Sequence, residues 1–198
     1  MAALLAWARA VEVRDPFASG HASRVCAMAE VIAHRLGWDE LDIEVLRMGA
    51  ALHDIGKLAV PEHILRKPGP LDEDELAEIR KHPEEGARMI APVRTLRPAV
   101  AAVLYHHERW DGTGYPMGIE GDAIPPEARV LAVVDAFDAM TTDRSYRRAM
   151  DERVAVVELE RCSGTQFDPE IVAAFIQAWR DGSLGEATFE FDFRAAAG

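Results

Sequence analysis

The residues of this chain that could do chemistry are mainly histidines and aspartates at the ends of apolar segments. His53 is followed by Asp54, and His106 and His107 stand side by side. His82 precedes a proline, which turns its backbone away from helical geometry and places it at a helix entrance. Imidazole and carboxylate groups without thiolates suit iron, manganese, zinc, cobalt or nickel, so these residues predict a metal site.

Asp135 adds a carboxylate from the middle of an apolar segment, LAVVDAFDAM. Such a carboxylate is costly unless it is paired or binds a metal, and Asp135 lies too far inside the predicted helix to cap it. Asp138 follows about one turn later and can support it, while His21 opens another predicted helix. Each histidine alone is better explained as structural, but together they offer ligands from separate helices. His34 and His63 lack such neighbours and are interpreted as surface or structural residues.

The composition limits which partners the chain can have. It has 198 residues, 49% of them apolar and 28% charged, as in globular proteins. The net charge of −12 argues against a binder of long nucleic acids, so an anionic substrate would need metals or a few arginines. No apolar run is long enough for a membrane span, and no basic region marks a signal peptide. We therefore expect a cytoplasmic protein, with Cys26 and Cys162 as free thiols.

Apolar periodicity predicts that nearly all of the chain is helical. Leu41, Val45, Met48 and Leu52 are predicted to form the buried face of the third helix, and 109–124 to form a glycine-rich loop. The predicted helices cover the N-terminal segment, 21–36, a segment from the Asp39 cap to Gly56, one from the capping box of Asp72 and Glu75 to about 81, one from Pro83, about 97–108, and segments that begin after Pro125, Asp151 and Asp168.

Residues 188–194 (TFEFDFR) alternate phenylalanine with other residues, which is the only strand-like period in the chain. The chain has no internal repeat and no linker long enough to divide it. We therefore predict one domain over residues 1–185 and a C-terminal extension over 186–198 that forms one strand or a tail.

Several ordered motifs resemble those of the HD-GYP family, a branch of the HD metal-dependent phosphohydrolase superfamily. They are His53-Asp54 with Gly56-Lys57, HHERWDGTGYP (106–116), DAFDAMTTDRSYR (135–147), GTQFDPEIV (164–172) and RDPFASGHASRV (14–25). The resemblance covers about residues 5–180. It implies an all-α HD-domain helical bundle with a GYP loop. It also implies hydrolysis of cyclic di-GMP, or a related cyclic dinucleotide, to pGpG or GMP by a hydroxide that bridges two metal ions.

The resemblance further implies how the metal ligands are divided. Asp54 would bridge two divalent ions, for which iron or manganese is expected first. The remaining ligands would be His53, Asp135 and His21 for one ion, and His82, His106 and His107 for the other. A glutamate that holds a third ion in some family members is replaced here by Phe17, so we expect two metals and not three.

Substrate contacts follow from the same motifs. Lys57 would stabilise charge on a phosphate oxygen, although a lysine near a helix end can also simply complement the helix dipole. Arg144 and Arg147 would bind phosphate or guanine, because arginine forks onto both. These two arginines directly follow the helix that carries Asp135.

The GYP loop is predicted to shape the pocket beside the metals. Gly112 and Gly114 permit positive φ and close backbone approach, and Gly114 is counted among the substrate-binding residues. Tyr115 offers a ring for stacking on a base or a hydroxyl for the phosphate. The loop could instead be a turn with a packed tyrosine, and the family analogy also allows a protein partner bound through this loop. A homodimer could form through the exposed edge of the 188–194 strand.

Two alternative functions remain open from the sequence. The chain could be an HD phosphohydrolase that acts on another nucleotide, although such an enzyme would not need the GYP loop or the 135–147 motif. It could also be a catalytically weak module that binds a cyclic dinucleotide or a protein. The complete set of predicted ligands argues against this second alternative.

Overall fold

The computed structural model describes residues 2–15, 19–143 and 148–185, and these ranges contain no β-strand. The all-α prediction is therefore confirmed, while the predicted strand at 188–194 lies outside the described residues. The helices are α1 (Ala2–Arg14), α2 (His21–Arg35), α3 (Glu40–Leu52), η1 (Ile55–Ala59), α4 (Glu62–Leu65), α5 (Glu73–Ile79), α6 (His82–Ile90), η2 (Arg94–Ala99), α7 (Val100–Tyr105), η3 (Gly121–Ala123), α8 (Pro126–Thr141), α9 (Glu152–Arg161) and α10 (Pro169–Arg180), where η marks a 3₁₀ helix.

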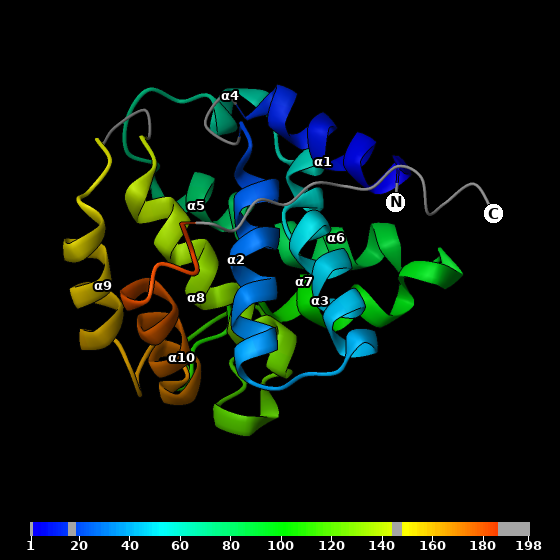
Figure 1. Cartoon of the computed structure of the whole chain (residues 1–198). Helices are drawn as coiled ribbons and strands as arrows, with labels where there is room; N and C mark the ends of the chain where they lie inside the picture. The colour runs from blue at the N-terminus through cyan, green and yellow to red at the C-terminus, as the bar shows by residue number, and fades with distance from the viewer. Residues whose placement is uncertain (1, 16–18, 144–147, 186–198) are drawn as a thin grey trace.

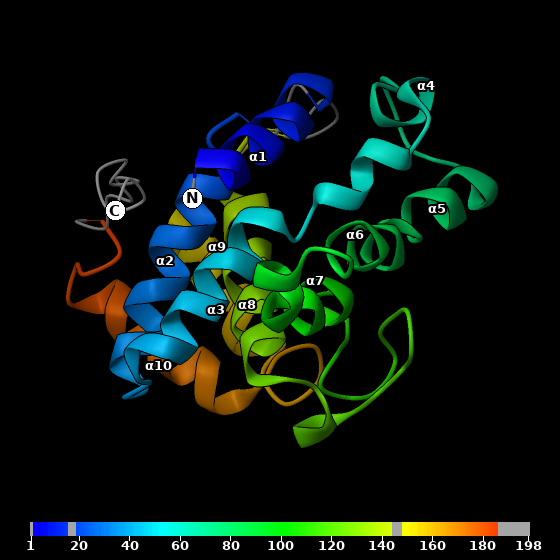
Figure 2. The ribbon, with the colours of Figure 1, turned by 90° about the vertical axis from the view of Figure 1, so that its right-hand side faces the viewer.

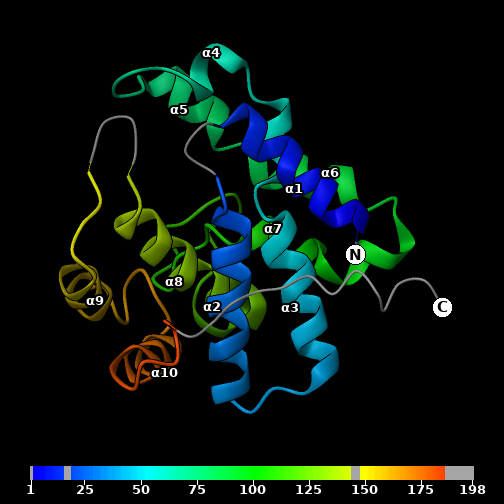
Figure 3. The same cartoon turned by 45° about the horizontal axis from the view of Figure 1, so that its top comes forward.

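The bundle is built around α2, which packs against α3, α8 and α10 (Figure 1). The helix α7 packs against both α3 and α8, and α6 packs against α7 and η1. Figure 2 shows the α4–α5 segment and the loop after α7 projecting on one side of the bundle, with α10 on the other. The first helix, α1, lies against α3 and η1 (Figure 3). None of the helices in the described ranges combines the length and apolar character needed to cross a bilayer.

Most predicted helix starts are confirmed by their caps. The side chain of Asp39 accepts hydrogen bonds from the backbone N–H groups of Leu41 and Asp42. Asp72 and Glu75 form the complete capping box that the sequence predicts. The predicted caps of α9 and α10 are likewise confirmed, because each carboxylate accepts a hydrogen bond from the first turn of its helix: Asp151 from Arg153 N and Asp168 from Glu170 N. Both cysteines are free thiols, with Cys26 buried and Cys162 half-buried.

The predicted buried face of α3 is wrong in part. Leu41 is 73% exposed, whereas Ile43, Leu46 and Ala50 are fully buried. The predicted set that contains Leu41 and the observed set that contains Ile43 both have helical spacing in the sequence. Packing against neighbouring helices determines which of the two sets is buried. Because α3 is enclosed by α2, α7 and α8, the face that carries Ile43 points inward and Leu41 is left at the rim.

The end of the third helix also differs from the prediction. The helix ends at Leu52 with His53 as its C-cap, and Gly56 lies inside η1 instead of terminating α3. A Cβ atom at Gly56 would stand 1.9 Å from the carbonyl oxygen of His82 and 2.5 Å from the backbone nitrogen of Gly86. Gly56 therefore serves the close contact between η1 and α6. The predicted helix over 97–108 is likewise shorter, since α7 ends at Tyr105 and η2 precedes it.

We predict that Gly56→Ala destabilises the fold because the added methyl group would collide with main-chain atoms of α6. The free energy of unfolding should fall by about 2 kcal/mol or more and the melting temperature by roughly 4–8 °C. Thermal unfolding followed by circular dichroism measures both. Gly185→Ala is the matched control, because a Cβ atom there meets nothing closer than 3.6 Å. Equal melting temperatures for the two variants would show that η1 and α6 can separate freely.

Candidate metal centre

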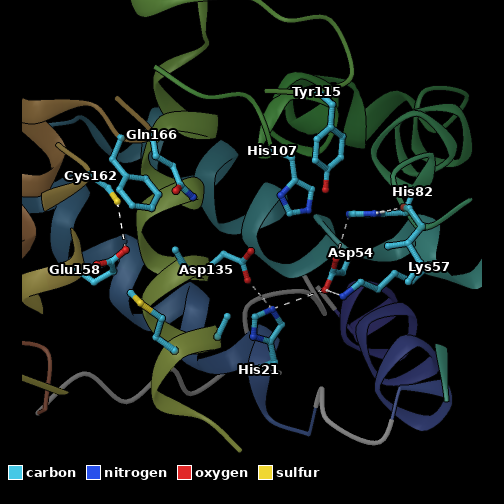
Figure 4. A pocket seen from close by; sticks show the side chains of 15 residues that line it. His21, Asp54, Lys57, His82, His107, Tyr115, Asp135, Glu158, Cys162 and Gln166 are labelled. Atoms are coloured by element: carbon cyan, nitrogen blue, oxygen red, sulfur yellow. Dashed lines mark hydrogen bonds and ion pairs between the residues drawn. The ribbon is translucent and has the colours of Figure 1, made fainter. Parts of the chain in front are cut away.

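A pocket of about 470 Å³ lies where α2, α6, α8 and the loop after α7 meet. Seven of the predicted site residues line this pocket (Figure 4). These seven residues are His21, Asp54, Lys57, His82, His107, Tyr115 and Asp135. His53 and His106 lie behind this layer and are buried.

Three of these histidines are fixed by the same backbone interaction. Each donates its Nδ1 hydrogen to the carbonyl group three residues earlier, at 2.8 Å, and each of these carbonyls lies in the last turn of a helix, where it lacks a helical partner. The pairs are His53 with Ala50, His82 with Ile79, and His106 with Val103. Because a carbonyl can only accept, the bond assigns the proton to Nδ1 and leaves a lone pair on Nε2 of the neutral ring.

The Nε2 atoms then face one another. His82 Nε2 lies 3.2 Å from His106 Nε2, and His21 Nε2 lies 3.1 Å from His53 Nε2. In the His82–His106 pair, two lone pairs at this separation repel unless a cation lies beside them. The donor set therefore fits metal ions, with each ring oriented by a hydrogen bond through its other nitrogen.

His21 is oriented by a carboxylate instead of a carbonyl. Its Nδ1 lies 2.7 Å from Oδ2 of Asp138, which also accepts hydrogen bonds from the guanidinium group of Arg24. Burial opposes protonation of His21, but the bond to Asp138 and the nearby carboxylates outweigh it and raise its pKa. The supporting role predicted for Asp138 thus has a definite form, and it acts on His21 and not directly on Asp135.

Asp54 stands between two groups of possible ligands. Its Oδ2 lies 3.6 Å from His53 Nε2 and 3.8 Å from His21 Nε2, while its Oδ1 lies 3.4 Å from His82 Nε2. Oδ1 of Asp135 lies 3.4 Å from His21 Nε2. The ligand atoms of each group lie within 4.8 Å of one another: His21, His53 and Asp54 in one, and His82, His106 and His107 in the other.

The protonation states suit metal binding. Burial lowers the pKa of His82 to about 4 and lowers those of His106 and His107 well below their usual value, so these rings are neutral at pH 7. Burial would raise the pKa of Asp54, but Lys57 and the histidines outweigh it and keep that pKa well below its usual value. These four residues therefore present free imidazole nitrogens and an ionised carboxylate without first having to lose protons.

Lys57 enters the site as the partner of Asp54. Its Nζ donates to Oδ2 of Asp54 at 2.7 Å and lies 3.8 Å from a carboxylate oxygen of Asp15. Burial would lower the pKa of Lys57, but these two carboxylates outweigh it and raise that pKa, so the ammonium group stays charged. The sequence did not reveal Asp15 as part of this cluster, because only the packing of α1 on η1 brings it there.

The GYP loop covers the His82–His106–His107 group. The ring of Tyr115 stacks on His107 at 4.8 Å, and the guanidinium group of Arg80 lies 5.4 Å from its centroid. Since the ring already has these neighbours, its hydroxyl is the part that points into the pocket (Figure 4). Burial raises the pKa of Tyr115, so the hydroxyl is protonated and can donate.

Glu108 holds the loop in place and was not singled out by the sequence. It is 3% exposed, and its Oε1 accepts hydrogen bonds from the backbone N–H groups of Met117 and Gly118 at 2.6 and 3.0 Å. Gly112 has the expected positive φ of 75°, whereas Gly114 does not have a positive φ. A Cβ atom on Gly114 would stand 2.4 Å from the backbone nitrogen of Arg109, so the residue allows the loop to close on itself. Its predicted substrate contact stays a prediction.

The remaining predicted residues fall elsewhere. Arg144 and Arg147 lie outside the described residues, as does Phe17, on which the expectation of no third metal rests. His63 is exposed and His34 forms a surface pair with Glu30, as predicted.

The depressed pKa of His82 predicts a pH dependence for the metal-free protein. The unfolded ring takes up a proton near pH 6.5 and the folded ring only near pH 4, so stability is complete above 6.5 and falls as the pH drops toward 4. This residue should contribute about 2 kcal/mol or more to the loss. Chemical denaturation at pH 7 and pH 4.5 should show a smaller loss in His82→Gln than in the wild type. The exposed-histidine control, His63→Gln, should lose as much as the wild type, and equal losses in all three proteins would contradict the assignment.

Comparison with known proteins identifies the family of this chain. The HD domain family matches residues 6–171. The chain is 40% identical over 172 residues to the cyclic di-GMP phosphodiesterase response regulator RpfG of Xanthomonas campestris, covering 86% of this chain and 46% of that protein. It is 37% identical over 174 residues to 3′3′-cGAMP-specific phosphodiesterase 2 of Vibrio cholerae, covering 87% of this chain and 33% of that protein. The chain thus spans less than half the length of these relatives.

A solved structure shares the fold. The cyclic GMP-AMP-specific phosphodiesterase V-cGAP3 of V. cholerae superposes with a TM-score of 0.74 at 18% identity, over 92% of this chain and 49% of that one. The matched residues include His21, His53, Asp54, His82, His106, His107 and Asp135. The chain belongs to the HD domain family, in its HD-GYP branch.

Proposed function

We propose that residues 1–185 form a metal-dependent phosphodiesterase domain that hydrolyses a cyclic dinucleotide, cyclic di-GMP first among them, to pGpG or GMP. The observation that carries this proposal is the position of Asp54, whose two carboxylate oxygens each face a different histidine group. That arrangement suits one carboxylate shared between two cations. The names of the relatives, which are phosphodiesterases for cyclic di-GMP and for 3′3′-cGAMP, support the substrate class.

The proposed ligands follow the two groups of side chains described above, with Asp135 added to the first group. His21, His53 and Asp135 would hold one ion, and His82, His106 and His107 the other, with Asp54 common to both. Iron or manganese is proposed first from the family resemblance, because a donor set without thiolate also suits zinc, cobalt and nickel. When bound, two such cations neutralise phosphate oxygens and lower the pKa of water enough to supply a nucleophile near neutral pH.

The chain's own groups would then bind and orient the phosphodiester. The Lys57 ammonium is charged and lies beside Asp54, so it can pair with a phosphate oxygen at the same place. The Tyr115 hydroxyl points into the pocket from the GYP loop and can act as a hydrogen-bond donor (Figure 4). The roles of Arg144 and Arg147 and a protein partner at the GYP loop stay predictions from the resemblance, and the homodimer stays a prediction from the 188–194 segment.

The two alternative functions differ in what the pocket must contain. An HD phosphohydrolase for other nucleotides would not need the GYP loop, yet here Glu108 and Tyr115 tie that loop to the metal ligands. A module that only binds would tolerate incomplete ligand groups, whereas both proposed groups have three possible ligand atoms within 4.8 Å of one another. Product analysis with cyclic di-GMP distinguishes all three, because only the proposed enzyme releases pGpG or GMP.

We predict that Asp54→Ala abolishes hydrolysis, because both ligand groups lose their common carboxylate. The rate should fall by about 10³-fold or more, and bound metal should be lost. Product release from cyclic di-GMP and elemental analysis of protein purified without oxygen measure the two effects. Circular dichroism should show unchanged helical content. Asp74→Ala on the exposed side of α5 is the control and should keep both metal and activity, whereas substantial activity in Asp54→Ala would refute the proposed function.

A further inference from the structure

The pocket extends beyond the metal ligands to a second end formed by α8 and the turn between α9 and α10. Ala136, Ala139, Met140 and Phe167 give this end apolar walls, and Gln166 supplies an amide. Asp135 and Ala139 lie one helical turn apart on α8, about 6 Å along its axis. The second end is therefore next to the place where a phosphodiester would meet the metals.

Several backbone hydrogen bonds fix the turn that carries Gln166. The carbonyl of Cys162 accepts hydrogen bonds from the backbone N–H groups of Thr165, Gln166 and Phe167. Two further backbone bonds join the turn to the HHERWDGTGYP loop: Trp110 N–H donates to the Gln166 carbonyl at 3.1 Å, and Asp111 N–H to the Thr165 carbonyl at 2.8 Å. The loop that covers the metal ligands thus also fixes the position of Gln166.

The side-chain amide of Gln166 has no hydrogen-bond partner among the residues that the structure describes. Its polar neighbours at this end are already paired. Both carboxylate oxygens of Glu158 accept from Arg161, and the thiol of Cys162 donates to Glu158 at 3.6 Å. Figure 4 shows the Gln166 amide on the same side of the pocket as Asp135, directed toward its interior. Gln166 is therefore the group here with a donor and an acceptor to offer a ligand.

Apolar walls and one half-buried amide without a hydrogen-bond partner among the described residues suit a flat ring with a polar edge. A nucleobase has apolar faces that pack on aliphatic and aromatic side chains, and an edge that carries donors and acceptors. A glutamine amide can form two hydrogen bonds with such an edge. We propose that Gln166 is a specificity-determining residue that reads the purine base next to the phosphodiester held at the metals. This inference rests on the proposed function.

The proposal makes a chemical distinction between guanine and adenine. The amide can turn over, and in either orientation it offers one donor and one acceptor, so it pairs with both purines. A carboxylate at the same place only accepts. Guanine presents two adjacent donors, N1–H and the N2 amino group, whereas adenine presents one donor beside an acceptor. Gln166→Glu should therefore favour guanine over adenine by about tenfold or more.

The experiment compares cyclic di-GMP with cyclic di-AMP, because both bases of each substrate are identical. The ratio of their kcat/KM values is measured for the metal-loaded wild type, for Gln166→Glu and for Gln166→Ala. We expect the ratio to rise about tenfold or more in Gln166→Glu. In Gln166→Ala, kcat/KM for the preferred substrate should fall by about tenfold, mainly through KM. Gln177→Glu, an exposed change on α10, is the matched control and should leave the ratio unchanged.

The outcomes separate the two proposals. A wild type that hydrolyses cyclic dinucleotides while Gln166→Glu shifts the ratio by less than threefold overturns the role of Gln166 and leaves the proposed function standing. A wild type that hydrolyses none of them refutes the proposed function, and the role of Gln166 falls with it. If Gln166→Glu does not fold, Gln166→Ala decides, since unchanged KM values there contradict a base contact.

Discussion

The site depends on one interaction that is repeated three times: a histidine just beyond the end of a helix donates Nδ1–H to the carbonyl three residues before it. The last carbonyls of a helix lack helical partners, so each histidine satisfies an acceptor that the fold would otherwise leave open. The same bond turns Nε2 toward the centre and fixes the tautomer that leaves it unprotonated. The helix ends of α3, α5 and α7 thus supply both the support and the ligand atom, and the bundle brings these ends together.

Close approach between helices sets how tightly these ends converge. Gly56 lets η1 touch α6, which brings Asp54 within 3.4 Å of His82. Small residues play the same part nearby, since a Cβ atom on Gly49 of α3 would stand 2.5 Å from the Cβ of Ala102 on α7. Side chains at these positions would push the two ligand groups apart. The distances in the centre are therefore a consequence of backbone packing in the core as much as of the ligands themselves.

The sequence could predict which side chains gather at the candidate centre because their residue types and positions are unusual for a helical core. Histidines beside Asp54 and Pro83, and Asp135 within an apolar helix, stand out in any single sequence, and the caps at Asp39, Asp72, Asp151 and Asp168 follow from local chemistry. What the sequence could not show are contacts made by elements distant along the chain. The pairing of Asp15 with Lys57, the inward face of α3 and the position of Gln166 beside Asp135 depend on how helices pack. Glu108 lay within a recognised motif, but its burial became visible only with the loop that closes over it.

The charges of the pocket indicate what an acidic chain would need in order to bind an anionic substrate. Asp54 and Asp135 carry two negative charges at the metal end, and Lys57 returns one positive charge, while His82, His106 and His107 are neutral. The nearby Asp138 is balanced by Arg24 and His21. Among the described groups, the protein alone therefore offers a phosphodiester no excess of positive charge at this place. Two divalent cations would reverse the sign of the field there, so affinity for the dinucleotide should depend on metal loading as strongly as turnover does.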